Sequence, residues 1–143
     1  MGKWALCGVE TVGGKGGVAL LILRLVSGAA FIQHGWPKFQ HAFNWMGADA
    51  TVPAFLQALA AVSEFGGGIA LMLGLLSRLA ALGIACVMLF AIFMVHLPKG
   101  DPFVSTGGSS YELAAVYLAM MLVFILRGPG QYALDALICR KKK

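Results

Sequence analysis

Residues 79–97, LAALGIACVMLFAIFMVHL, form a nineteen-residue run without a formal charge. As a helix that rises about 1.5 Å per residue, a run of this length measures about 28 Å, close to the roughly 30 Å hydrocarbon core of a bilayer. Pro98 follows directly and favours an end to the helix there. The run therefore predicts a helix that crosses a membrane.

The composition of the whole chain agrees with this prediction. Of the 143 residues, 59% are hydrophobic and only 12% are charged, whereas roughly a quarter are charged in an average soluble domain. The mean hydropathy is +0.83. A small globular domain leaves much of its chain at the surface and could not bury this excess, and disordered chains have the opposite composition. The composition excludes both classes and indicates a membrane protein.

Three further apolar segments have lengths that suit a membrane span, and turn-forming residues lie between them. Pro37 follows the first segment, Ser77 and Arg78 are predicted to form a very short turn after the second, and Gly128-Pro129-Gly130 follows the last. We therefore predict an all-α fold, a polytopic four-transmembrane-helix bundle. Its four helices are expected at about residues 18–36, 53–76, 79–97 and 111–127.

The predicted domain organisation has three parts. Residues 1–17 are Gly-rich and form an N-terminal arm, and residues 18–127 form the transmembrane domain. Residues 128–143 are expected to form a short amphipathic helix that lies on the membrane interface, followed by a basic tail.

The basic residues outside the segments predict the orientation. Eight lie on the side that holds both termini: Lys3, Lys15, Arg78, Arg127, Arg140 and Lys141–Lys143. Two lie on the other side, Lys38 and Lys99. Because Lys and Arg accumulate in cytoplasmic loops, both termini are expected in the cytoplasm. The dense basic run borders apolar sequence, which is typical of contact with membrane lipid and does not indicate nucleic-acid binding.

The cysteines give no sign of metal or redox chemistry. Cys7, Cys86 and Cys139 are far apart and form no CxxC pair, so the sequence predicts neither a zinc site nor a dithiol. No pattern for haem or flavin is present either. We predict no metal and no covalently bound cofactor.

Several ionisable residues fall within or at the ends of the spans. Inserting a charged side chain near the centre of a membrane helix costs roughly 2.5–3.5 kcal/mol, so such side chains usually face the protein interior. On the first helix, Arg24, His34 and Lys38 share one face, and on the second Glu64 shares a face with small residues. We expect these faces to meet. The candidate ligand-binding cluster at the outer half of the bundle is His34, Lys38, Glu64, His96 and Glu112.

Structural interpretations of the same residues stay open. Arg24 and Glu64 are candidates for an ion pair that fixes helix register. Ser109 and Glu112 have the spacing of a capping box. Lys38 has the position of an anchor at the membrane interface, and Trp45 that of an interface aromatic.

Five blocks of the chain resemble the DoxX family of small membrane proteins, relatives of the small subunit of thiosulfate:quinone oxidoreductase. The blocks are LRLVSGAAFIQHGWPKF (23–39), SEFGGGIALMLGLLSRLAALGIA (63–85), MLFAIFMVHLPKG (88–100), YELA (111–114) and RGPGQYALDAL (127–137). The resemblance implies a four-helix bundle in the bacterial inner membrane, associated with redox enzymes and quinone-linked oxidation. It also implies that the five candidate residues form the polar cluster of the family.

The leading hypothesis is an integral membrane subunit of a redox complex, which binds a quinone-like or small apolar ligand and supports a partner oxidoreductase. Histidines could exchange protons, a Lys or Arg could polarise a carbonyl and a carboxylate could relay protons. The alternative is a non-catalytic anchor or assembly factor for a partner complex or homo-oligomer. A proton or solute pathway is a third possibility, which four helices leave little room for.

Overall fold

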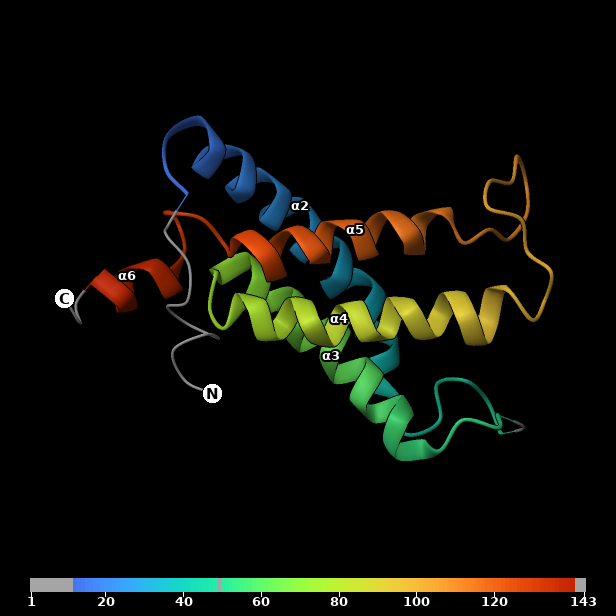
Figure 1. Ribbon diagram of the computed structural model, residues 1–143. Coiled ribbons are helices and arrows are strands. Elements are labelled where there is room, and N and C mark those ends of the chain that lie inside the picture. The colour runs from blue at the N-terminus through green and yellow to red at the C-terminus, as the bar shows by residue number, and fades with distance from the viewer. Residues whose placement is uncertain (1–11, 49, 141–143) are drawn as a thin grey trace.

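The computed structural model describes residues 12–48 and 50–140 of the chain, and all its regular elements within these ranges are helices. They are α2 (Gly14–Gln40), α3 (Ala54–Leu73), α4 (Ser77–Phe90), the π-helical segment η1 (Ala91–His96), α5 (Glu112–Arg127) and α6 (Leu134–Arg140) (Figure 1). Most of the predicted N-terminal arm (residues 1–11) and the last three lysines of the basic tail lie outside the described residues.

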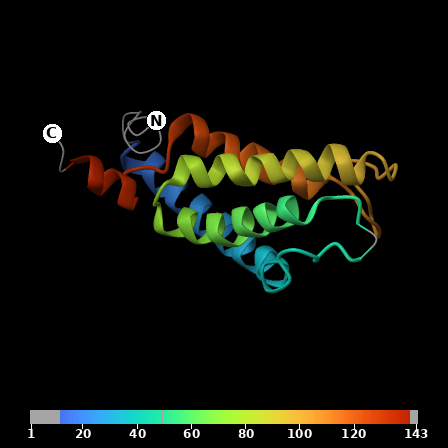
Figure 2. The same ribbon diagram turned by 90° about the horizontal axis from the view of Figure 1, so that it is seen from below.

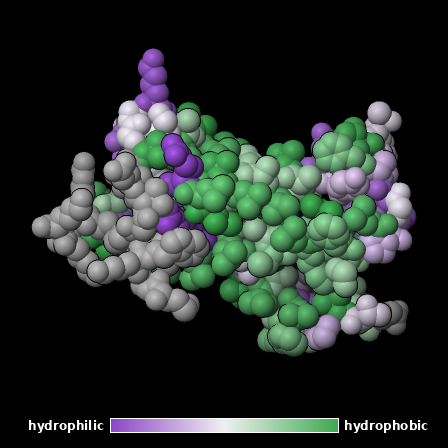
Figure 3. All heavy atoms as spheres, viewed as in Figure 1, coloured by the Kyte–Doolittle hydropathy of each residue, from purple (hydrophilic) through white to green (hydrophobic). Residues whose placement is uncertain are grey.

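Three of these helices are long and apolar enough to cross a membrane: Gly14–Gln40, Ala54–Leu73 and the continuous Ser77–His96. Their outward side chains are large and hydrophobic, for example Ile22, Leu59 and Phe93, which are 57%, 58% and 58% exposed. In Figure 3, hydrophobic residues cover the middle of the molecule and hydrophilic ones gather toward its two ends. Such a surface suits lipid better than water. The fourth long helix, α5, is apolar but has 16 residues.

Consecutive long helices run in opposite directions, so their connections lie at two ends of the bundle (Figures 1 and 2). The loops 41–53 and 97–111 lie at one end, which we call the loop end. The start of α2, the α3–α4 turn and α6 lie at the other, which we call the terminal end. Helix α3 packs against both α2 and α4, and α5 packs mainly against α4.

Helices α2 and α3 approach closely because glycines line their contact, as the sequence predicts. A Cβ added to Gly68 would lie 2.8 Å from the Ile32 nitrogen, and one added to Gly28 would lie 2.8 Å from the Gly68 carbonyl oxygen. Gly35 lies against the backbone of Phe65 in the same way, with a Cβ 2.8 Å from the Phe65 Cα. Small residues at helix contacts of this kind are the usual means of association in lipid.

Helix α2 extends the predicted residues 18–36 at both ends: it begins at Gly14, within the predicted N-terminal arm of residues 1–17, and Pro37 does not end it. Proline removes one backbone donor, but one further helical turn follows before the helix ends at Gln40. This extra turn keeps Lys38 on α2, four residues beyond His34 and therefore on the same face.

The turn between α3 and α4 also differs from its prediction. Ser77 and Arg78 belong to the first turn of α4, and the chain reverses over residues 74–76, where Gly74 and Leu76 have φ values of 70° and 49°. Asp135 holds this turn from α6: its carboxylate accepts the N–H groups of Leu76 and Ser77 at 2.8 and 2.9 Å. The carboxylate thus caps the N-terminus of α4 with a residue distant in sequence.

The glycine contact between α2 and α3 predicts a position-specific loss of stability. We expect Gly35→Ala to lower the free energy of unfolding by about 1–3 kcal/mol, because its methyl group would displace the Phe65 backbone. Gly66→Ala is the matched control, since its Cβ would meet only Val62 Cγ1, at 3.9 Å. Thermal or denaturant unfolding in detergent measures both, and equal stability of the two variants would contradict this account of the packing.

Candidate functional site

A cavity of about 940 Å³ lies among α2, α3, α4 with η1, and the start of α5. Most of its wall is hydrophobic. The polar side chains that line it are His34, Lys38, Gln57, Ser63, Glu64, His96, Ser110 and Tyr117. Four of the five candidate residues predicted from sequence therefore share one cavity: His34, Lys38, Glu64 and His96.

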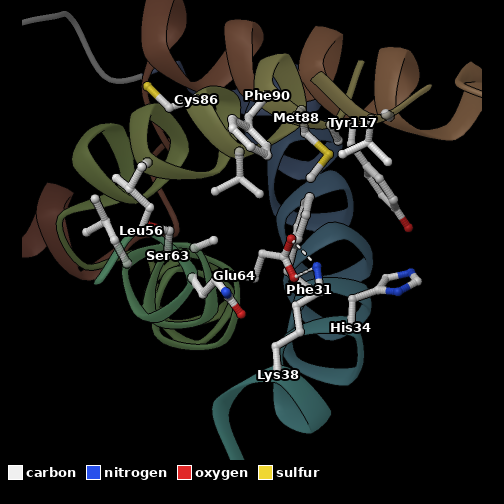
Figure 4. Close-up of a pocket in the computed structure, with 18 of the residues that line it drawn as sticks. Phe31, His34, Lys38, Leu56, Ser63, Glu64, Cys86, Met88, Phe90 and Tyr117 are labelled. Atoms are coloured by element: carbon white, nitrogen blue, oxygen red, sulfur yellow. Dashed lines mark hydrogen bonds and ion pairs between the residues drawn. The ribbon is translucent and has the colours of Figure 1, made fainter. Parts of the chain in front are cut away.

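The buried charge of the cavity is an ion pair between α2 and α3. The Lys38 ammonium lies 2.7 Å from each carboxylate oxygen of Glu64 (Figure 4). The Glu64 side chain is 2% exposed and that of Lys38 is 27% exposed. Among the described residues, no donor other than Lys38 reaches this carboxylate. The pair neutralises a charge that would otherwise be very costly at this depth.

The loop 41–53 is tied to this pair through Gln57 on α3. The Gln57 side chain is buried, accepts the Met46 N–H at 3.1 Å and donates to the Val52 carbonyl at 2.9 Å. The Trp45 indole N–H donates to the Gln57 backbone carbonyl at 2.9 Å. Trp45 is thereby held with its ring 4.6 Å from the Lys38 ammonium, a cation–π contact on the loop side of the pair.

His34 lies one turn before Lys38 on α2 and is exposed at the cavity edge. Its ring meets that of Tyr117 from α5 edge to face, with centroids 6.3 Å apart. Tyr117 also packs against buried Phe31, with centroids 4.7 Å apart. In Figure 4 the His34 side chain points away from the Lys38–Glu64 pair, so the two form separate polar points of the cavity.

His96 closes η1 at the loop end, and its Nδ1 lies 2.7 Å from the Asp101 carboxylate. The Ser109 hydroxyl donates to the same carboxylate oxygen at 2.7 Å. The Ser109 hydrogen bond first, and the His96 hydrogen bond second, hold the pKa of Asp101 below its ordinary value. Asp101 is therefore ionised at neutral pH.

The cavity wall reaches the outer surface between α3 and α4. Leu59 and Val62 on α3 line it while 58% and 51% exposed, and Leu79 and Leu82 on α4 line it while 51% and 42% exposed. These side chains belong to helices that are long and apolar enough to cross a membrane. We call this seam between α3 and α4 the lateral opening.

The structure corrects the ion pair predicted between Arg24 and Glu64. Glu64 pairs with Lys38, whereas Arg24 donates to the carbonyl oxygens of Pro129 and Tyr132 at 3.2 and 3.1 Å, near the terminal end. The reason is depth: Arg24 lies almost four turns before Lys38, at the level of the segment that follows α5. Arg24 is a structural residue of the terminal end and takes no part in the cavity.

Two predictions about the start of α5 are also wrong. Glu112 is exposed in the first turn of α5 and does not line the cavity, although Leu113 and Ala114 do. The capping box is not formed, because the Ser109 side chain is turned toward Asp101 and the helix begins after Tyr111 without a side-chain cap.

Sequence reasoning missed Gln57, Asp101 and Tyr117 as cavity or supporting residues. Gln57 had a usable signal, because it lies seven residues before Glu64 and therefore on the same helical face. Asp101 lies in a loop, and nothing in its spacing from His96 indicates that the chain folds back to it. The described residues hold no group of three His, Cys, Asp or Glu side chains that could bind a metal ion.

Comparison with known proteins identifies the family. The DoxX family model matches residues 19–97, which include α3, α4 with η1, and nearly all of α2. The chain belongs to the DoxX family. The matched segment supplies Lys38, Glu64 and His96, so most of the polar cavity wall lies within the DoxX region.

Relatives of this DoxX protein match over most of their length. An uncharacterized protein of Haemophilus influenzae is 37% identical over 120 residues, which are 81% of this chain and 87% of that protein. The inner membrane protein YqjF of Escherichia coli is 30% identical, covering 87% of this chain and 95% of YqjF. A Bacillus subtilis protein named "Putative oxidoreductase CatD" is 29% identical, covering 88% and 91%. No solved structure matches the chain.

The Lys38–Glu64 pair predicts strongly non-additive mutations. We expect Lys38→Met to lower the free energy of unfolding by about 3 kcal/mol, because it leaves the buried Glu64 carboxylate without a counter-charge. Adding Glu64→Gln to this variant is expected to recover most of that loss. Unfolding in detergent, measured for both single variants and the double variant, gives the coupling energy. Additive losses would contradict the pairing.

Proposed function

We propose that this DoxX protein is a multi-pass protein of the bacterial inner membrane that binds a lipid-soluble, quinone-like ligand in its cavity and supports a partner oxidoreductase. The observation that carries the proposal is a hydrophobic cavity with the lateral opening between α3 and α4 and a neutralised ion pair in its wall. An apolar ring and tail fit the wall, and the polar groups suit carbonyl or hydroxyl oxygens.

The proposed topology has four spans and cytoplasmic termini. Helix α5, with 16 residues, is about 24 Å long, packs along α4 and joins the same two ends of the bundle as the other helices. The terminal end then carries the excess of basic residues and faces the cytoplasm. The name of YqjF as an inner membrane protein supports this location.

Two polar groups of the cavity wall, Lys38 and His34, have a chemical role in this proposal. Lys38 is partly exposed and has donors beyond those it uses for Glu64, so it can donate to a ligand carbonyl oxygen. His34 is exposed at the cavity edge and can donate or accept a proton. The CatD name supports a link to oxidoreductases. In this proposal the chain only binds the ligand, so electrons would pass to or from a partner protein.

A second candidate function is a membrane anchor or assembly factor without a ligand. The observation that favours it is that Lys38 and Glu64 satisfy each other, as they would in a purely structural pair. In that case Glu64→Gln lowers the melting temperature and leaves the activity of the partner complex unchanged.

Ligand binding tests the leading proposal. In a Trp4→Phe, Trp36→Phe background reconstituted into nanodiscs, we expect a decyl-tailed benzoquinone to quench the fluorescence of Trp45, which lines the cavity and is then the remaining tryptophan. His34→Ala combined with Glu64→Gln should weaken binding about tenfold or more, since the first removes a polar contact with the ligand and the second removes the carboxylate that holds Lys38 in place. Gln33→Ala is the matched control, because Gln33 is an exposed neighbour on α2 outside the cavity wall. Equal affinity in all variants would remove these residues from the site.

The lateral opening can be tested separately through Cys86, which is exposed and lines the cavity. In a Cys7→Ser, Cys139→Ser background, we expect a saturating benzoquinone analogue, fully substituted on its ring so that it does not itself react with the thiol, to slow alkylation of Cys86 by a lipid-soluble maleimide about tenfold, because a bound ligand covers the thiol. The rates are measured by mass spectrometry. A Leu89→Cys, Cys86→Ser variant is the control, since Leu89 is exposed on α4 but does not line the cavity. Equal protection at both positions would show nonspecific partitioning and reject the lateral opening.

A further inference from the structure

The side chains of His96, Asp101 and Ser109 form a hydrogen-bonded cluster at the loop end. His96 lines the cavity, and its Nδ1 lies 2.7 Å from Asp101 Oδ2. Ser109 donates to the same oxygen at 2.7 Å and lies 3.5 Å from the imidazole nitrogen. Among the described residues, no hydrogen bond is made by His96 Nε2, so this ring nitrogen keeps its capacity to bind a further molecule.

The local fold places Asp101 beside His96 through the backbone as well. The π-helical segment η1 ends with the Leu97 N–H bonded to the Ile92 carbonyl at 3.0 Å. Gly100 then takes a φ of 74°, which favours glycine, and the Asp101 N–H returns to the His96 carbonyl at 3.1 Å. Backbone and side chain of Asp101 therefore both bind His96, and π-helical segments of this kind are frequent at functional sites.

The tautomer of His96 follows from this arrangement. An ionised carboxylate can only accept hydrogen bonds, so the Nδ1 that faces Asp101 must carry a hydrogen. In the neutral ring, Nε2 then has a free lone pair and can only accept. Two nearby cations do not change this assignment. The Lys38 ammonium in the cavity is paired with Glu64, and Lys99, which also attracts Asp101, is exposed in the loop and does not line the cavity.

We propose that Asp101, supported by Ser109, is a positioning residue that makes His96 a hydrogen-bond acceptor toward the cavity, so that the site prefers a hydroquinone over the matching quinone. A hydroquinone hydroxyl can donate to Nε2, whereas a quinone carbonyl has no hydrogen to donate and would place two acceptors against each other. The inference rests on the proposed function, because it specifies which form of the lipid-soluble ligand the cavity selects.

The test compares the two forms of one ligand at equilibrium. Decyl-tailed hydroquinone and benzoquinone are titrated anaerobically into the reconstituted Trp4→Phe, Trp36→Phe chain, with Trp45 fluorescence as readout. We expect the hydroquinone to bind about tenfold more tightly. Asp101→Asn is expected to abolish or reverse this preference, because an Asn amide can donate to Nδ1 and turn Nε2 into a donor, as Asp→Asn does in serine protease triads. Ser109→Ala should keep the direction of the preference, and Lys99→Gln is the matched loop control.

A second measurement reads the tautomer without any ligand. The ¹⁵N chemical shifts of the His96 ring, assigned with His34→Ala and His41→Ala variants, are expected to show a protonated Nδ1 in the wild type and an altered tautomer in Asp101→Asn. Equal affinity for both ligand forms, or an unprotonated Nδ1 in the neutral wild-type ring, would overturn the inference while the proposed function stands. Binding of neither form would overturn both.

Discussion

The structure depends on one constraint, which is that a charge within an apolar bundle must be neutralised by the protein itself. Lys38 and Glu64 meet this constraint between α2 and α3, where the ammonium lies 2.7 Å from both carboxylate oxygens. Their pairing requires close helices, and the glycines of α2 and α3 permit that approach. The ion pair and the glycine contact therefore support each other.

The two ends of the molecule satisfy this constraint with different groups. At the terminal end, Arg24 donates hydrogen bonds to carbonyl oxygens of the C-terminal segment, and Asp135 accepts hydrogen bonds from N–H groups of the α3–α4 turn. These bonds hold the segments of that end together. Toward the loop end, Lys38 and Glu64 share the cavity with His34 and His96, whose rings keep hydrogen-bonding capacity. Side chain–backbone contacts therefore join the segments of the terminal end, whereas the ion pair and the polar cavity groups lie toward the loop end.

Hydrogen bonds with the two loops hold polar groups of the cavity wall in place. Gln57 fixes the loop that places Trp45 over Lys38, and Asp101 binds the Nδ1 of His96. In the proposed function, the ligand enters through the lateral opening and has a small polar head, which suits a site of this form.

The sequence by itself determined the membrane class, the helical character and the faces that carry charge, because these follow from composition and from helical period. It could not determine which charges pair. Arg24 and Lys38 lie on the same face of α2, and only the relative depth of α3 and of the C-terminal segment decides that Lys38 reaches Glu64 while Arg24 binds Pro129 and Tyr132. The contact between His96 and Asp101 likewise depends on the π-helical segment η1 and on the turn at Gly100. Neither feature leaves a periodic pattern in the sequence, so neither could be predicted from it.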